Sequence, residues 1–239
     1  TSGQTTSAGG TGRTTSQMFD KNNFTGFDFT NTWGNGDNQT TPYLTNLTGN
    51  QVFNKNDIPT GIISPTNAPK LYTAVLNINQ LQNINQNLAN NYVLGNNIDA
   101  TATASWNNGQ GFTPIGNEYN GFTGKLDGLG HSVNNLTINR PSTDYVGLIG
   151  FTNGATIQNI GVAGGSITGQ YYVGGLVGEN YNSTINNAYA TGNVDSIGNF
   201  AGGLVGVNSS NSSINNAYAT GKVEGLFGVG GLVGYNDNS

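Results

Sequence analysis

A four-residue phrase recurs along the chain at a fixed interval, and this interval constrains the fold more than any other feature. The tetrad Gly-Leu-Ile/Val-Gly places its leucines at 148, 176, 204 and 232, so successive copies are 28 residues apart. A fixed period of this size is the signature of a solenoid, in which each repeat forms one coil and buries its apolar edge against the next. We therefore expect the second half of the chain to consist of stacked coils.

A second phrase lies between the tetrads and indicates what the coils are made of. Its four copies are SVNNLTI (132–138), TIQNIGV (156–162), TINNAYA (184–190) and SINNAYA (213–219). Two apolar positions that flank one variable residue describe a β-strand with one buried face. The alignment also predicts a column of stacked side-chain amides at a corner. Its members are Asn135, Asn159, Asn187 and Asn216.

The composition excludes a helical repeat. The chain has 38 glycines in 239 residues, whereas helices need uninterrupted runs of good helix formers. Glycine and asparagine instead favour tight turns between short strands, because both tolerate a positive φ. The predicted fold is therefore all-β, a parallel β-helix (solenoid) with coils of about 28 residues.

The first part of the chain differs from the repeats. Residues 1–70 are predicted to form an irregular or β segment that ends in a proline-containing linker at 56–70, and the β-helix is assigned to 71–239. Within the first segment, FTGFDFTNTW (24–33) is expected to form a strand, because its phenylalanines alternate with polar residues.

One short helix is expected near residues 79–89. Leu81, Ile84 and Leu88 follow helical spacing, and Asn79 is the expected N-cap. A helix at this place would cover the open end of the solenoid, where strand edges and core would otherwise be exposed.

Charge and cysteine content exclude several classes of function. The net charge is −5, and seven scattered Lys and Arg residues form no basic patch for nucleic acid or for anionic lipid. No apolar run approaches the roughly 20 residues of a membrane-spanning helix, so no membrane insertion is expected. The absence of cysteine excludes disulfides and thiolate metal sites. The first residues lack the pattern of a signal peptide, which is typical of an excised or processed piece.

The sequence predicts no catalytic residue, no metal site and no cofactor. His131 is the only histidine, and it lies in a turn phrase before a predicted strand, so a structural role is expected. The acidic residues occupy no fixed column of the repeat, which argues against a calcium ladder and against the paired carboxylates of a polysaccharide-cleaving enzyme. A single calcium ion near Asp127 is the remaining alternative.

Tyrosines concentrate in the regular coils and form a candidate binding face. A tyrosine offers a large contact area with a polar tip, which suits recognition. The alternative is that stacked rings shield the sheet. The candidate residues are Tyr172, Tyr181, Tyr189, Tyr218 and Tyr235.

Seven Asn-x-Ser/Thr sequences permit N-glycosylation. Their number is about what a chain this rich in Asn, Ser and Thr contains by chance, so they do not by themselves indicate glycans. The candidate sites are Asn23, Asn38, Asn46, Asn135, Asn182, Asn208 and Asn211.

The phrase GGLVGxN…INNAYATGxV resembles the GLUG repeat, which occurs in large bacterial surface proteins of the filamentous-haemagglutinin type, many of them secreted by the two-partner route. LQNINQNLANNYVLGNNIDATA with FTPIGN…FTGKLDGLGHSVNNLTI resembles the segment that precedes GLUG coils. TSGQTTSAGGTGRTTSQM…FTGFDFTNTW resembles the segment that closes such an array. The resemblance implies a right-handed β-helix on a bacterial cell surface that acts in adhesion, biofilm formation or haemagglutination.

Three functional interpretations follow. The favoured one is a non-enzymatic, extracellular structural and adhesive segment, a rigid stalk that presents a binding face to host cells, matrix or other bacteria through surface glycans or proteins. The first alternative is a carbohydrate-active β-helix enzyme or glycan-binding module. The second is a filament subunit that associates end to end, because the last copy of the repeat stops at Ser239.

Overall fold

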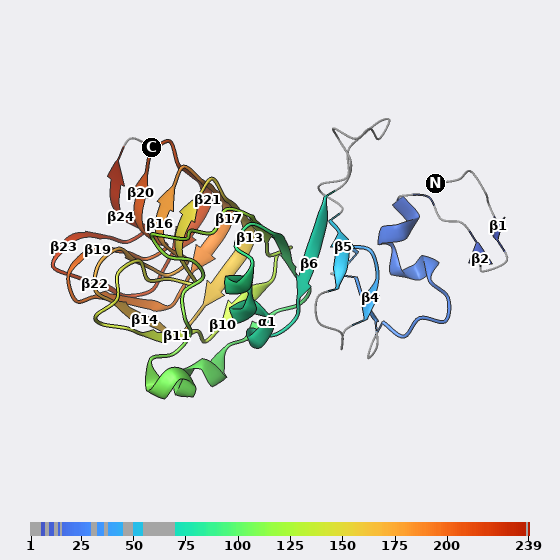
Figure 1. The fold of residues 1–239 in the computed structure, drawn as a ribbon, viewed down its shortest axis with the longest axis horizontal. Helices are drawn as coiled ribbons and strands as arrows, with labels where there is room; N and C mark the ends of the chain where they lie inside the picture. The colour runs from blue at the N-terminus through green and yellow to red at the C-terminus, as the bar shows by residue number, and fades with distance from the viewer. Residues whose placement is uncertain are drawn as a thin grey trace. The chain divides into compact units, whose positions relative to one another are not determined.

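The computed structural model describes residues 6–7, 10–11, 14, 16–29, 33–35, 38–44, 50–54, 70–237 and 239. The chain divides into two compact units, residues 1–74 and residues 75–239 (Figure 1). The linker expected at 56–70 lies outside the described residues except for its last position.

The first unit contains short elements only. Its 3-10 helices are Ser16–Phe19 and Lys21–Asn23. Its antiparallel pairs are β1 (Thr6–Ser7) with β2 (Gly10–Thr11), β3 (Trp33–Gly34) with β4 (Tyr43–Leu44), and β5 (Gln51–Phe53) with β6 (Leu71–Val75).

The strand expected over 24–33 is wrong for residues 24–29, which form no strand, whereas Trp33 at the end of that range belongs to β3. The chain turns at Gly26, where φ is 90°, and the Phe27 amide donates to the Phe24 carbonyl at 3.2 Å. The rings of Phe24, Phe27 and Phe29 then pack together with centroids 5.5 to 6.3 Å apart. The alternation of phenylalanines therefore reflects a ring cluster around a turn, and not one face of a sheet.

The short helix expected near 79–89 is present but begins earlier. Helix α1 spans Ile78–Gln82 and continues as a 3-10 helix over Asn83–Gln86. Its N-cap is Asn77, whose side-chain oxygen accepts from the Gln80 amide at 3.0 Å, so the prediction of Asn79 as N-cap is wrong. Both asparagines precede apolar residues at a suitable spacing. Asn77 is the N-cap because its backbone is extended, as an N-cap requires, whereas Asn79 lies inside the helix.

Residues 91–237 form a parallel β-solenoid of about four coils, which confirms the predicted fold class (Figure 1). Four stacks of hydrogen-bonded strands run through the coils. The first contains β9 (Lys125–Asp127), β13 (Thr156–Ala163), β17 (Thr184–Ala190) and β21 (Ser213–Ala219), extended by β7 (Asn91–Leu94), β8 (Ile98–Asp99) and β10 (Ser132–Asn134). The second contains β11 (Thr137–Asn139), β14 (Ser166–Gly169), β18 (Asn193–Ser196) and β22 (Val223–Glu224).

The third stack follows the tetrads, and the fourth is the shortest. The third contains β12 (Ile149–Asn153), β16 (Val177–Tyr181), β20 (Val205–Ser209) and β24 (Val233–Asp237). The fourth contains β15 (Val173–Gly174), β19 (Asn199–Gly202) and β23 (Phe227–Gly230). A 3-10 segment, Thr101–Gly109, leaves the coils and is broken by non-helical backbone at 106–108.

The register corrects the alignment of the first repeat. Residues 132–134 pair with 161–163, so SVNNLTI is in register with 161–167 and not with 156–162. The long strand β13 has two neighbours on one side, β9 along its first half and β10 along its second. Asn135 therefore stands beside Gly164, and its assignment to the Asn159 column is wrong.

Asn159 and Asn187 of that column stack as expected. The side-chain nitrogen of Asn187 donates to the Asn159 oxygen at 3.0 Å, and both residues adopt left-handed backbone with φ of 51°. The Asn159 nitrogen in turn donates to the carboxylate of Asp127 at 3.0 Å. Asp127, considered above as a calcium ligand, is fully buried and also accepts from the Gln158 side chain at 2.7 Å, so its carboxylate forms the first rung of this ladder.

A second ladder runs inside the third stack. The side-chain nitrogen of Asn180 donates to the Asn208 oxygen at 2.7 Å, and that of Asn208 donates to the Asn236 oxygen at 2.9 Å. Asn180 and Asn208 are buried, so each depends on its neighbours for hydrogen bonds that water would otherwise supply.

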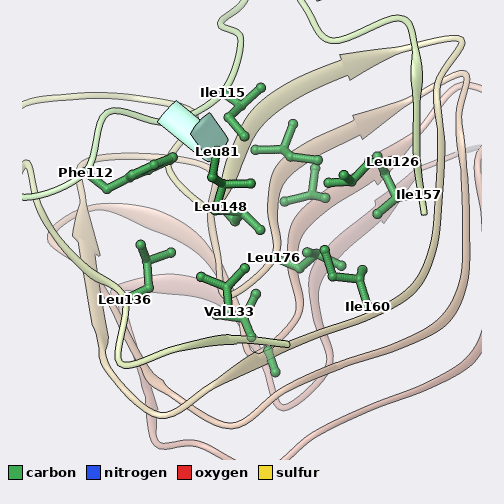
Figure 2. Packing of buried hydrophobic residues seen from close by; sticks show 14 of the residues in the cluster. Leu81, Phe112, Ile115, Leu126, Val133, Leu136, Leu148, Ile157, Ile160 and Leu176 are labelled. Carbon is green, nitrogen blue, oxygen red and sulfur yellow. The ribbon is translucent and has the colours of Figure 1, made fainter. Parts of the chain in front are cut away.

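The apolar core fills the space that the coils enclose. Leu148, Leu176 and Leu204 of the tetrads are fully buried, and Leu81 of α1 belongs to the same cluster. Figure 2 shows side chains from successive coils directed toward one another in this interior. Leu232, in the last coil, is only partly buried.

The two repeated phrases fit each other through small residues. A Cβ atom on Gly175 would lie 2.7 Å from the Cβ of Ala190, and one on Gly203 would lie 2.8 Å from that of Ala219. Real Cβ atoms essentially never approach this closely. In these two coils the first glycine of the tetrad and the last alanine of the AYA phrase therefore interlock, and each requires the other to stay small.

Candidate binding face

Aromatic rings from successive coils form one connected network, which we call the aromatic face. Tyr145 and Tyr172 stack almost parallel, with ring centroids 4.6 Å apart. Tyr172 contacts Phe200 at 5.4 Å, and Phe200 contacts Tyr235 at 5.3 Å. These separations are close to the spacing of neighbouring strands, about 4.7–4.9 Å, so the rings repeat with the coils. The members are Tyr145, Phe151, Tyr172, Tyr181, Phe200 and Tyr235.

Phe151 joins the remaining rings to this column. It meets Tyr145 edge-on at 5.6 Å and stacks on Tyr181 at 5.8 Å. The residue in register with Tyr181 in the next coil is Ser209, whose small side chain leaves part of the ring uncovered. Tyr181 is 37% exposed.

Three residues of the face have strained backbone. Tyr145, Tyr172 and Phe200 adopt the left-handed conformation, with φ of 58°, 56° and 66°. Bulky residues rarely adopt it, and such positions cluster at functional sites where the surrounding structure enforces them. The main chain packs closely here, since a Cβ on Gly206 would lie 2.6 Å from the Tyr172 backbone.

Glu179 interrupts an otherwise apolar column on this face. It stands in register between Phe151 and Val207, and it is half-buried. Burial raises the pKa of its carboxyl group above the ordinary value, against the opposing effect of a 2.8 Å hydrogen bond donated by the Ser209 hydroxyl. The negative charge of Glu118 raises that pKa further. A carboxyl group with a perturbed pKa beside an aromatic surface marks a candidate functional site.

The phenols of the face are held in their protonated form. Burial raises the pKa of Tyr145 and of Tyr172, and the negative charges of Glu118, Glu179 and Asp144 contribute in the same direction. Both phenols therefore carry a hydrogen-bond donor and an acceptor at neutral pH.

The five tyrosines that the sequence singles out fall into two groups. Tyr172, Tyr181 and Tyr235 belong to the aromatic face. Tyr189 and Tyr218 form a separate stack on β17 and β21, with centroids 5.2 Å apart and planes 6° apart. In that stack each ring covers its neighbour, although Tyr218 is still 54% exposed.

Sequence reasoning missed half of the aromatic face. Tyr145, Tyr172 and Phe200 recur at intervals of 27 and 28 residues just before the tetrads, so the period itself carries the signal once phenylalanine and tyrosine are treated alike. Phe151 follows the first tetrad directly, in the column of Glu179.

The candidate glycosylation sites differ in accessibility. Asn135, Asn182 and Asn211 are exposed and adopt left-handed backbone. Asn23 and Asn38 are half-buried, and Asn46 lies outside the described residues. The side-chain nitrogen of Asn208 is engaged in the buried ladder, so a glycan there would require the ladder to open. Glycosylation stays a prediction.

Within the described part of the chain, no three His, Asp or Glu side chains gather as a metal-ligand set. His131 lies in the turn before β10 and is half-buried. None of the helices in the described residues has the length and apolar content needed to cross a membrane.

Comparison with known proteins identifies the repeat. The sequence model of the GLUG motif matches residues 169–195 and 201–224. Over 112 residues the chain is 40% identical to halomucin of Haloquadratum walsbyi, an alignment that covers 42% of this chain and 1% of halomucin. Over 107 residues it is 34% identical to a protein of Evansella cellulosilytica described as a Gly-rich membrane protein. That alignment covers 42% of this chain and 12% of the relative. No solved structure matches the chain significantly.

Proposed function

We propose that this chain is a structural repeat segment of an extracellular surface protein, and that its aromatic face binds glycans carried by other cells or by matrix. The GLUG repeats fit a repeat region of a surface protein, as do relatives named as a halomucin and as a Gly-rich membrane protein. The parallel solenoid, with its buried ladders and interlocked glycines, supports a rigid support role.

The position of Glu179 carries the binding part of the proposal. A solenoid built only for support gains nothing from a half-buried carboxyl group in an apolar column, because burial of the charged form is unfavourable. Sugars present apolar C–H faces together with hydroxyl groups. The part of the Tyr181 ring that Ser209 leaves open can pack against a C–H face, and the Glu179 carboxyl group can hydrogen-bond to the hydroxyl groups.

A glycan array tests the proposal. The 239-residue chain is applied to neutral and acidic glycans, in parallel with Tyr181→Ser, Glu179→Gln and a control, Tyr218→Ser, which removes a more exposed ring from the other stack. We expect the first two changes to reduce binding by roughly tenfold, as for a contact of 1–2 kcal/mol, and the control to have little effect. A chain that binds no glycan on the array is a support segment only. Loss of binding in Tyr218→Ser alone would place the site on the other stack.

A second candidate, a carbohydrate-cleaving enzyme, is favoured by one observation. Glu179 has the raised pKa that a general acid needs, and the charge of Glu118 acts on it. Incubation with a panel of polysaccharides and measurement of new reducing ends tests this candidate. Activity that Glu179→Gln abolishes would support catalysis, whereas the adhesive proposal expects no cleavage.

A third candidate is end-to-end association of chains. In the last coil Leu226 and Phe227 are 68% and 72% exposed, and Val229 is 46% exposed. Apolar side chains gathered in this way favour contact with another molecule. Light scattering over a range of concentrations tests it: a growing mass supports association, and a constant monomer mass contradicts it.

A further inference from the structure

The turn at residues 139–143 and the loop at 107–110 enclose a polar hollow that shares no residue with the aromatic face. Its volume is about 300 Å³, at the lower end of the range for small-molecule sites, about 300–1,000 Å³. Apart from Gly109 and Pro141, it is lined by polar side chains: Arg140 donates hydrogen bonds, and the amides and hydroxyls both donate and accept them. The polar lining residues are Asn108, Gln110, Asn139, Arg140, Ser142 and Thr143.

Arg140 gives the hollow a positive charge that no acid neutralises. Its Nε donates to the Phe112 carbonyl at 3.1 Å, Nη1 to the Gln110 side-chain oxygen at 3.3 Å, and Nη2 to the Thr113 hydroxyl at 2.9 Å. All three acceptors are neutral, and no carboxylate of the described residues lies within ion-pair distance of the guanidinium, Asp144 of the same turn included. One N–H remains on each terminal nitrogen.

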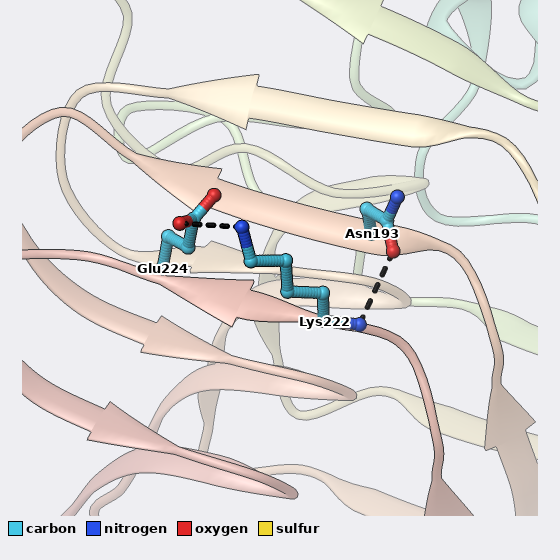
Figure 3. A network of polar contacts seen from close by, with 3 residues as sticks. All are labelled: Asn193, Lys222 and Glu224. Carbon is cyan, nitrogen blue, oxygen red and sulfur yellow. Dashed lines mark hydrogen bonds and ion pairs between the residues drawn. The ribbon is translucent and has the colours of Figure 1, made fainter.

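Lys222, a cation in a later coil, is in a different situation. Lys222 pairs with Glu224 at 2.7 Å, and both side chains are well exposed (Figure 3). In contrast, Arg140 is half-buried, and burial lowers its pKa, although a guanidinium remains charged at any physiological pH. A half-buried cation without an acidic partner calls for an anion, and in a chain of net charge −5 such an anion would bind through a local site and not through the overall field.

Both walls of the hollow are held by main-chain hydrogen bonds. The Asn139 amide donates to the Gln110 carbonyl and the Arg140 amide to the Thr168 carbonyl, each at 2.9 Å. Asn107 and Asn108 hold the loop in left-handed backbone, with φ of 52° and 56°. The site is therefore formed before any ligand binds, which lowers the entropy cost of binding.

We propose that this hollow binds an acidic sugar, a uronic acid residue, with Arg140 contacting its carboxylate. A planar guanidinium matches a carboxylate in geometry as well as charge. The amides and hydroxyls around Arg140 provide partners for the sugar hydroxyls, which neither an inorganic anion nor a simple carboxylic acid would use. The small volume of the hollow fits one sugar residue. This residue can be the last one of a glycan, or an inner one whose neighbouring sugars remain in solvent.

Ligand-observed NMR with the 239-residue chain tests the proposal, using glucuronate, glucose, acetate and inorganic sulfate as probes. We expect saturable binding of glucuronate at least about tenfold tighter than that of the other three, since a charge-assisted hydrogen bond contributes about 1.5–3 kcal/mol. Added salt should weaken it. If glucose binds as tightly as glucuronate, the charge is not recognised. If acetate or sulfate binds as tightly as glucuronate, the sugar hydroxyls are not recognised. Either result overturns the proposal.

Substitutions locate the site. Arg140→Gln should abolish glucuronate binding, whereas Lys222→Gln, which removes a cation from an exposed ion pair, should leave it unchanged. Because Arg140 also holds the Phe112 carbonyl, thermal unfolding checks that Arg140→Gln folds. If it does not fold, Asn108→Gly decides: it keeps Arg140 and the left-handed backbone, and it should weaken binding roughly threefold through loss of one neutral hydrogen bond. Unchanged affinity in Asn108→Gly would exclude the hollow.

The hollow and the aromatic face can fail separately. Tyr181→Ser should leave glucuronate binding intact, and Arg140→Gln should leave binding of neutral glycans on the array intact. The inference thus goes beyond the proposed function and does not depend on it.

Discussion

Single polar residues inside this solenoid have no solvent to replace a lost partner. Asn208 is the clearest case, because it is 4% exposed and lies between Asn180 and Asn236 in the ladder. Removal of its side chain takes the 2.7 Å acceptor from the buried Asn180 amide nitrogen, which keeps only a longer bond to the Ser183 carbonyl at 3.3 Å. The Asn236 oxygen is exposed and still accepts from Ser239, so the cost falls on the Asn180 side.

We expect Asn208→Ala to lower the free energy of unfolding by about 1–3 kcal/mol, the cost of leaving buried polar groups unpaired. Chemical denaturation measures it. Asn215→Ala is the matched control, because Asn215 donates to Asn186 in an exposed ladder, and surface changes alter stability by about 0.5 kcal/mol or less. Equal effects of the two changes would contradict a special role for the buried ladder.

Glu179 makes the stability of the chain depend on pH. Its folded-state pKa lies above the ordinary value of 4.5, so between these two values the native state binds more protons than the unfolded chain. Stability is fully present below pH 4.5 and decreases as the pH rises through the folded-state pKa. Glu179→Gln still accepts the Ser209 hydrogen bond but has no charge to bury.

We therefore expect the free energy of unfolding of Glu179→Gln, relative to the wild type, to be higher at pH 7 than at pH 4. Urea denaturation at several pH values compares the two proteins. Parallel profiles would show that burial does not disfavour the charged form of this carboxyl group.

At the scale of elements, the tetrad leucines contribute to the stability of each coil through their burial. Leu176 is fully buried between coils, whereas Leu232 at the equivalent place in the last coil is only partly buried. We expect Leu176→Ala to destabilise by about 2–5 kcal/mol and Leu232→Ala by clearly less. Thermal unfolding of the two variants checks this, and equal losses would mean that the last coil packs as tightly as the inner ones.

The elements also show where sequence reasoning succeeds and where it fails. The period, the parallel strands and the buried columns follow from the repeat itself. The phrase at 132–138 is misaligned because β13 pairs with β9 along one half and with β10 along the other, and both partners carry the same apolar alternation. Only the three-dimensional register separates two segments of one coil that satisfy the same pattern.

For the whole molecule, stability should vary along the solenoid. Strand β21 lies at the edge of its stack, and the side chains of the last coil are more exposed than those of inner coils. In a stack of repeats each coil depends on its neighbours, so the last coil should open most readily. We expect amide hydrogens of β21 and β24 to exchange faster than those of β13 and β17. Uniform protection would instead indicate one cooperative unit.

The candidate sites could be predicted less well than the fold. Tyrosine columns follow from the period, but the division of Tyr181 and Tyr218 between two separate stacks depends on which sheet each strand joins. Arg140 gives no signal in the sequence, because it lies outside the regular phrases. Its environment is set by contacts with a loop about 30 residues earlier in the chain.

The interlock of Gly175 with Ala190, and of Gly203 with Ala219, has a consequence for how such a chain can change over time. These two contacts lie within single coils, and the same glycines also meet the next coil: a Cβ on Gly175 would clash with the Gly203 carbonyl oxygen, and one on Gly203 would clash with that of Gly231. A whole coil can therefore be duplicated or deleted while equivalent contacts form again. Every duplication adds about 4.7–4.9 Å along the axis. The length of the solenoid therefore changes in steps of one coil.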